Sequence, residues 1–342
     1  MTFSFDPMQA KKSWLEIVAK YQNPDVRKSV WQIINSIAPY VALWALMYFS
    51  MQYSYWLTLL LAIPTAGFTM RIFIILHDCG HGSFFKSQKA NDIVGSICGV
   101  ITYTPYFQWR HEHAIHHATS GHLDRRGVGD VMTLTVKEYM ALSGSGKLKY
   151  RLYRNPLVMF LFAPLFVFFI SHRFISSASS KARERNSVHY TNLALLAVIL
   201  VLSYFIGFKE FWLIQFPIMA LSSSAGVWMF YVQHQFEETY WDHAPEWQYV
   251  RAAMQGSSYY KLPKILQWFT GNIGFHHIHH LNPRIPNYNL EKCLKENTIF
   301  QQANIITLWA SFKTMSYKLW DEETNKLVGF GYIKKFKLNR AR

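Results

Sequence analysis

Four long apolar runs dominate the pattern of hydrophobic and polar positions along the chain. They cover residues 31–51, 55–76, 191–208 and 211–232, and Arg71 is the single charged residue within them. A helix of about 20 mostly apolar residues crosses the hydrocarbon core of a bilayer. The pattern therefore predicts an all-α integral membrane protein with four transmembrane helices.

The spacing of these runs predicts two helical hairpins. Three residues separate the first run from the second, and Lys209 and Glu210 separate the third from the fourth. Lysines and arginines concentrate before residue 31, between the hairpins and after residue 232, whereas the short outer turns carry almost none. By the positive-inside rule, both termini and the long central segment are expected to be cytoplasmic.

A fifth apolar run, residues 157–170, is shorter than the others. It follows Pro156, contains Pro164 and ends just before His172. A run of this length is more typical of a re-entrant or interfacial element than of a span. Near the C-terminus, residues 305–320 place apolar side chains at helical spacing, which predicts an amphipathic helix that lies on the membrane or caps the site.

Composition supports a membrane protein and restricts its partners. Hydrophobic residues make up 51% of the chain and charged residues only 16%, where a soluble domain carries about 25%. The net charge of +15 fits anionic lipid headgroups and an acidic protein partner, while nucleic acid is a poor choice for a chain this apolar. We expect one membrane domain over residues 1–342 with cytoplasmic lobes.

Histidines are concentrated in three windows. The chain has 15 histidines, and ten of them fall in HDCGH (77–81), HEHAIHH (111–117) and HHIHH (276–280). Side chains three and four positions apart lie on one face of a helix. Each window therefore presents two or three imidazoles to one side, and neutral imidazole is the commonest metal ligand.

The predicted topology places these windows on one side of the membrane. Four spans leave all three at the cytoplasmic face, whereas counting residues 157–170 as a span would separate the second window from the third. His234, just past the fourth run, emerges on the same face. The candidate ligands are thus His77, His81, His113, His116, His117, His234, His276, His279 and His280.

Nine imidazoles exceed the four to six donors that usually satisfy one metal, so the set implies two ions. An all-imidazole site suits zinc, copper, iron or nickel, and structural zinc sites are usually rich in cysteine. A cytoplasmic site beside lipid favours chemistry on an acyl chain. Breaking an unactivated C–H bond requires an oxidant such as an iron-bound oxygen species, although the histidines alone leave the metal open.

The three windows resemble the histidine boxes of the membrane fatty acid desaturases. HDCGHGSFF (77–85), HEHAIHHATS (111–120) and GNIGFHHIHHLNPRIPNY (271–288) are most similar to bacterial and cyanobacterial acyl-lipid desaturases of the omega-6, or delta-12, type. The resemblance implies a four-span, mushroom-like fold whose cytoplasmic helical cap holds a diiron site. It also implies an O₂-dependent enzyme that places a cis double bond in a fatty acyl chain.

The resemblance assigns roles to particular residues. It makes the eight box histidines the iron ligands and His234 the further ligand found near the end of the last span. Related animal enzymes also have an asparagine that reaches one iron through water, but Phe230 occupies that position here, and the role passes to Asn272, four residues before His276. Carboxylates that could accept the free ring N–H of a ligand are Asp78, Glu112, Asp130, Glu237 and Asp242.

Partners and alternatives follow from the same resemblance. The expected partners are a fatty acyl lipid and a separate electron donor such as an acidic ferredoxin. The expected membrane is, in a bacterium, the inner membrane. A lipid hydroxylase or ketolase of the same superfamily would share every ligand. A histidine-rich metal transporter would need polar or ionisable residues lining the spans at midplane, whereas these spans are nearly all apolar and the histidines lie at one rim. The acyl length, head group and bond position stay open.

Overall fold

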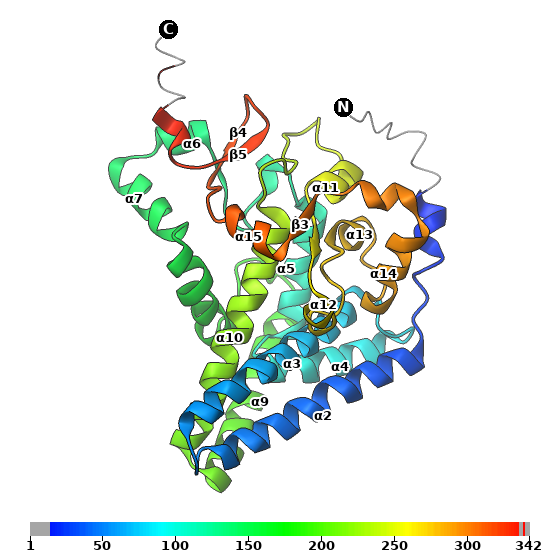
Figure 1. The fold of residues 1–342 in the computed structure, drawn as a ribbon, viewed down its shortest axis with the longest axis vertical. Coiled ribbons are helices and arrows are strands. Elements are labelled where there is room, and N and C mark those ends of the chain that lie inside the picture. Colours follow the sequence, from blue (N-terminus) through cyan, green and yellow to red (C-terminus); the bar gives the residue numbers. More distant parts are fainter. Residues whose placement is uncertain (1–13, 335–337, 339–342) are drawn as a thin grey trace.

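The computed structural model describes residues 14–334 and 338, and its four longest helices form the predicted two hairpins (Figure 1). These helices are α2 (Val26–Ser50), α3 (Tyr55–His81), α9 (Ala182–Ile206) and α10 (Phe208–His234). All four are long and apolar enough to cross a membrane. The predicted fold class is therefore confirmed.

The spans extend beyond the apolar runs at the ends that carry histidines. Helix α3 continues to His81 and α10 to His234, so each carries histidines on its last turns. Gly82, with φ of +67°, ends α3 in the left-handed conformation that glycine adopts without strain. Gly207, with φ of +96°, makes the turn between α9 and α10. These two turns fix where the first box ends and how the second hairpin closes.

Two helices between the hairpins begin the cap. Helix α4 (Gln88–Ile101) packs on α3, and α5 (Tyr106–Thr119) packs between α3 and α9. The hydroxyl of Tyr106 donates to the carbonyl of Cys79 at 2.8 Å, which joins α5 to the first histidine window. These contacts hold the second window against the first.

Close packing of α4 predicts a stability effect at Gly99. A Cβ at this position would lie 2.5 Å from the backbone oxygen of Thr104, and both residues are buried. Gly99→Ala should therefore destabilise the protein by about 1–3 kcal/mol, the usual cost of overpacking. The apparent Tm of the purified protein in detergent measures the effect. Gly144→Ala, where nothing lies within 4 Å, is the matched control, and an equal loss there would contradict the packing argument.

The segment that contains residues 157–170 is a broken helix beside α10 (Figure 1). It follows α7 (Gly144–Tyr153) and runs through π-helical turns Val158–Phe162 and Phe166–Ile170 on either side of α8 (Ala163–Leu165). Helix α7 and the stretch Val158–Arg173 are bent by 56° relative to each other, so together they could also count as a bent fifth span by length and composition. Its re-entrant or interfacial position stays a prediction.

Short elements complete the cap. Besides the helices given above, the short helical elements in the described part of the chain are η1 (Leu123–Arg125), α6 (Val136–Ala141), η4 (Ser171–Arg173), α11 (Tyr249–Gln255), α12 (Lys264–Phe269), α13 (His276–Leu281), α14 (Asn287–Glu296), η5 (Thr298–Gln302) and α15 (Leu308–Thr314). The strands are β1 (Leu134–Thr135), β2 (Tyr259–Lys261), β3 (Ile305–Thr307), β4 (Leu319–Asp321) and β5 (Lys326–Val328). They form a β1-β4-β5 sheet and a parallel β2-β3 pair.

The prediction of one amphipathic helix over residues 305–320 is wrong. Strand β3 occupies its first residues because Ile305 and Thr307 pair with β2. Thr307 then caps α15 by accepting from the backbone N–H of Ala310. Only residues 308–314 are α-helical, and β4 follows because Leu319 pairs with Val328. Backbone pairing with distant segments overrides the local helical periodicity.

The third window is held by the largest buried cluster of the cap. Ile278, fully buried between the histidines, belongs to a core that also includes Val18, Val232, Phe275 and Leu290. This core joins the N-terminal segment, the end of α10, α13 and α14. Helix α13 is therefore fixed by apolar packing on one side, while His276, His279 and His280 face the other.

Candidate metal centre

Five histidines from three helices form a first group, here called cluster A. One nitrogen from each residue lies within 4.8 Å of all the others. Helix α3 contributes two residues, α5 two and α13 one. The members are His77, His81, His113, His117 and His279.

Four further histidines form a second group, here called cluster B. Its members are His116 of α5, His234 of α10, and His276 and His280 of α13, and all are buried. The two clusters are in direct contact, because the ring of His117 from cluster A stacks on the ring of His280 from cluster B with centroids 4.2 Å apart. The structure thus brings all nine predicted histidines together.

The helical spacing explains how two windows serve both clusters. On α5, His113 and His117 are four residues apart and belong to cluster A, whereas His116 points to cluster B. On α13 the same spacing gives His276 and His280 to cluster B and His279 to cluster A. A helix places such residues on adjacent parts of one face.

Hydrogen bonds fix the tautomers in cluster B. His116 Nδ1 lies 2.5 Å from Asp130 Oδ1, and His234 Nδ1 lies 3.3 Å from the carbonyl of Gly256. Carboxylate and carbonyl oxygens only accept, so both Nδ1 atoms carry the proton and both Nε2 atoms are left with lone pairs. Those Nε2 atoms face each other at 3.2 Å. Two lone pairs so close repel unless a cation lies between them.

Cluster A has the same arrangement. His77 Nδ1 donates to Asp78 Oδ1 at 3.1 Å, so its Nε2 is an acceptor. That Nε2 lies 3.0 Å from His279 Nε2, which in turn lies 3.0 Å from His117 Nε2. The buried Nε2 of His81 has no hydrogen-bond partner among the residues that the structure describes. The donor set of both clusters therefore fits a bound metal ion.

Burial keeps these imidazoles in their metal-binding form. Burial is the largest cause that lowers the pKa values of five ring nitrogens well below the usual value, and neighbouring imidazoles add to it. The five residues are His113, His117, His276, His279 and His280. The rings are therefore neutral at pH 7, and neutral imidazole is the species that coordinates metals.

Each cluster has one carboxylate that orients a histidine. Asp78 accepts from His77 and also from the backbone and side-chain N–H groups of Asn287, at 2.7 and 2.8 Å. Asp130 binds His116, while its Oδ2 is buried and has no partner within residues 14–334. Glu237 and Asp242, two other candidates, form their hydrogen bonds away from the clusters.

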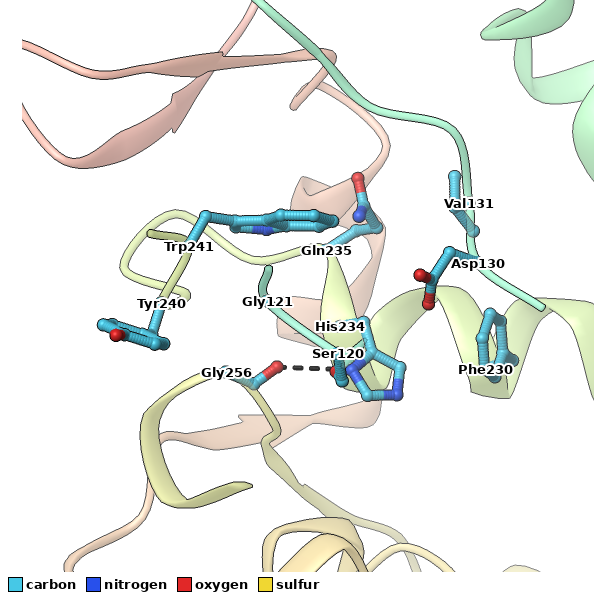
Figure 2. A pocket seen from close by; sticks show the side chains of 10 residues that line it. All are labelled: Ser120, Gly121, Asp130, Val131, Phe230, His234, Gln235, Tyr240, Trp241 and Gly256. Atoms are coloured by element: carbon cyan, nitrogen blue, oxygen red, sulfur yellow. Dashed lines mark hydrogen bonds between the residues drawn. The ribbon is translucent and has the colours of Figure 1, made fainter. Parts of the chain in front are cut away.

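A small cavity lies beside cluster B. Its volume of about 10 Å³ is close to what one water molecule requires. Figure 2 shows Asp130, Phe230 and His234 around it, with His234 bonded to Gly256. The ring of Phe230 lies 5.0 Å from that of His116. This apolar ring occupies the position for which the resemblance implies an asparagine.

Asn272 is held by neighbouring segments. Its Oδ1 accepts from Gln267 Nε2 at 2.8 Å, and its Nδ2 donates to the carbonyl of Asn287 at 3.2 Å. These bonds tie the turn before α13 to α12 and α14. A role for Asn272 at the metal stays a prediction that these contacts do not support.

Two residues near the site were missed from the sequence. Asn287 holds Asp78, and the hydroxyl of Tyr249 donates to the carbonyl of His280 at 2.6 Å. The sequence around these two residues gives no sign that they support the metal centre, because their contacts join segments far apart in the chain. His277 belongs to neither cluster, and its Nε2 bonds the carbonyl of Phe300 at 2.9 Å.

Comparison with known proteins agrees with this geometry. The sequence model of the family described as fatty acid desaturase matches residues 54–305. A fatty acid desaturase of Bacillus subtilis (strain 168) is 47% identical over 324 residues, which is 95% of this chain and 92% of that protein. The sn-1 oleoyl-lipid 12-desaturase of Synechocystis sp. is 28% identical, over 66% of this chain and 64% of that protein. The sn-1 acyl-lipid omega-3 desaturase (ferredoxin) of Nostoc sp. (strain 36) is 27% identical, over 65% of this chain and 62% of that protein.

Proposed function

This chain belongs to the fatty acid desaturase family, and we propose that it introduces a cis double bond into a fatty acyl chain of a membrane lipid, with O₂ as co-substrate. The observation that carries the proposal is the convergence of nine imidazoles in two clusters at the C-terminal ends of α3 and α10. Two adjacent metal sites beside apolar spans suit the oxidation of an unactivated C–H bond.

We propose that each cluster holds one iron ion and that the nine histidines are the ligands. Bound iron would supply the oxidising power that removes two hydrogens from the chain. Asp78 and Asp130 would keep His77 and His116 in the tautomer whose Nε2 faces the metal. The surrounding buried cap excludes bulk water from the reacting carbons.

The position of the double bond is proposed from the relatives. The Synechocystis enzyme is named for the 12 position of an oleoyl lipid, which supports a delta-12, or omega-6, assignment. The Bacillus relative, with higher identity, carries a generic name. An acyl lipid substrate also suits a site at the level where the spans leave the bilayer.

A ferredoxin is the proposed electron donor. The Nostoc relative is named for that donor, and this chain has a net charge of +15. A basic surface attracts an acidic carrier and raises its association rate. Reduction between turnovers would then come from a separate protein at the cytoplasmic face.

Exposed side chains on two short helices support the proposed membrane orientation. Trp268 of α12 stacks under Arg71 and contacts Phe68, both of α3, while Phe312 of α15 contacts Trp228 of α10. These contact points lie one to three turns before the histidines of each span. Trp309 of α15 is 80% exposed. Apolar surface at this depth fits the cytoplasmic leaflet of a bacterial inner membrane, with both termini in the cytoplasm.

The fatty acid profile of a host that lacks polyunsaturated lipids tests this function. Expression of the protein with iron and a ferredoxin system should produce a new dienoic acid, and fragmentation of a derivative should place the new bond at the 12 position. An oxygenated chain would instead indicate a hydroxylase. A double bond elsewhere would retain the family and reject the delta-12 assignment.

A further inference from the structure

The guanidinium of Arg154 is completely buried where separate segments of the cap meet. Its two terminal nitrogens donate hydrogen bonds of 2.8 to 3.3 Å. The acceptors are Met132 O, Thr133 Oγ1, Tyr231 Oη, Gln235 Oε1 and Tyr317 O. Every one of these oxygens is uncharged, so the buried cation is held by dipoles.

A buried cation of this kind tolerates little movement of its partners. Arginine stays charged at all ordinary pH values, and an ion removed from water is costly unless its donors are hydrogen-bonded. A second buried cation also needs fixed partners, because Lys318 donates to the carbonyl of Arg154 at 2.7 Å. Burial, with Arg154 nearby, lowers the pKa of Lys318 to about 8. The segments that supply the acceptors must therefore keep their positions.

Two of those segments adjoin cluster B: one carries His234 and the other follows the partner of His116. Gln235 directly follows His234, and Tyr231 lies one turn earlier on α10. On the other side, Met132 and Thr133 follow Asp130, the residue that fixes the tautomer of His116. Thr133 Oγ1 and Gln235 Oε1 are 3.2 Å apart, so the two segments also meet directly. In the described part of the chain, the side-chain hydrogen bonds of Arg154 do not reach α3, α5 or α13, the helices of the cluster A histidines. The other cluster B histidines also lie on α5 and α13, so Arg154 acts on cluster B through Asp130 and the end of α10.

We propose that Arg154 is a positioning residue for the metal ion of cluster B. It holds the segment after Asp130 and the end of α10 in fixed register, so that His116 and His234 present their Nε2 atoms to one point. The inference rests on the proposed two-metal function. It assigns a role to a buried charge that takes no part in binding substrate or metal.

Iron(II) binding by the full chain in detergent micelles, in competition with a chelator, tests the proposal without an activity assay. Arg154→Lys is measured in two backgrounds, each of which leaves one cluster intact. With His279→Ala, which breaks cluster A, Arg154→Lys should weaken the remaining site by roughly 10-fold, the lower end of the range for loss of a ligand's own partner, because Arg154 acts through Asp130 and the end of α10. With His276→Ala, which breaks cluster B, it should leave the remaining affinity unchanged.

Two further variants separate positioning from general folding. Thr133→Val removes one acceptor of the same network and should weaken only cluster B. Arg173→Lys is the matched control, because Arg173 also donates to uncharged oxygens, those of Asn192 and Tyr103, away from the clusters. This control should not change either affinity.

The outcomes divide clearly. Equal weakening in both backgrounds, no weakening in either, or the same pattern for Arg173→Lys overturns the role of Arg154. An otherwise unaltered chain that binds fewer than two iron ions overturns the metal centre itself, and that result is seen before any variant is compared. Selective weakening of cluster B by both Arg154→Lys and Thr133→Val supports the proposal.

Discussion

Replacement of His279 by alanine should abolish desaturation and remove the metal ion from cluster A. His279 Nε2 lies 3.0 Å from the Nε2 atoms of both His77 and His117, so it sits at the middle of that cluster. Losing a direct ligand should weaken metal binding by more than the roughly 100-fold that loss of an outer partner can cost. Iron per purified protein and product formation in the same preparation measure both effects.

The matched control is His189→Ala, because His189 is exposed on α9 and belongs to neither cluster. It should retain iron and activity. His279→Ala protein should also still insert into the membrane, since the apolar core around Ile278 is unchanged. Wild-type turnover by His279→Ala would remove this residue from the ligand set.

Replacement of Asp78 by alanine should weaken the metal site and the fold together. Asp78 is 1% exposed and accepts from the ring of His77 and from two N–H groups of Asn287. Its loss frees the ring of His77 to rotate, so the iron affinity of cluster A should fall roughly 10- to 100-fold. The unpaired donors of Asn287 should cost about 1–3 kcal/mol of stability. Chelator competition and thermal unfolding separate the two effects.

A carboxylate in a comparable structural network provides the control. Asp92 binds Arg110 and Arg183 and so joins α4, α5 and α9 without touching a cluster histidine. Asp92→Ala should lower the apparent Tm but leave iron affinity unchanged. If Asp78→Ala loses stability and keeps its iron affinity, the carboxylate supports the fold only and does not orient His77.

Local patterns in the sequence were sufficient for the spans and for the nine histidines. Hydropathy identifies α2 and α10 because the bilayer imposes a length on an apolar helix, and the i, i+3, i+4 spacing already places His113, His116 and His117 on one face. Division of the histidines between two clusters depends on how α3, α5 and α13 are packed, which spacing alone does not specify.

The residues that were missed act across long sequence separations. Asn287 reaches Asp78, 209 positions away, and Arg154 reaches Tyr317, 163 positions away. Residues 305–307 follow the helical pattern but pair with β2. In each case a distant backbone or side chain decides the outcome, and periodicity carries no information about it.

The interleaved histidines of α5 and α13 also affect how the centre is assembled. Each of these helices contributes to both clusters, so neither cluster can be closed without drawing the same two helices together. If each cluster holds an ion as proposed, the first ion to bind would complete the alignment of these two packed helices, and the second would meet a site that is already arranged. Uptake of the two ions would then be coupled through the shared helices, and partly loaded protein should be a minor species during maturation.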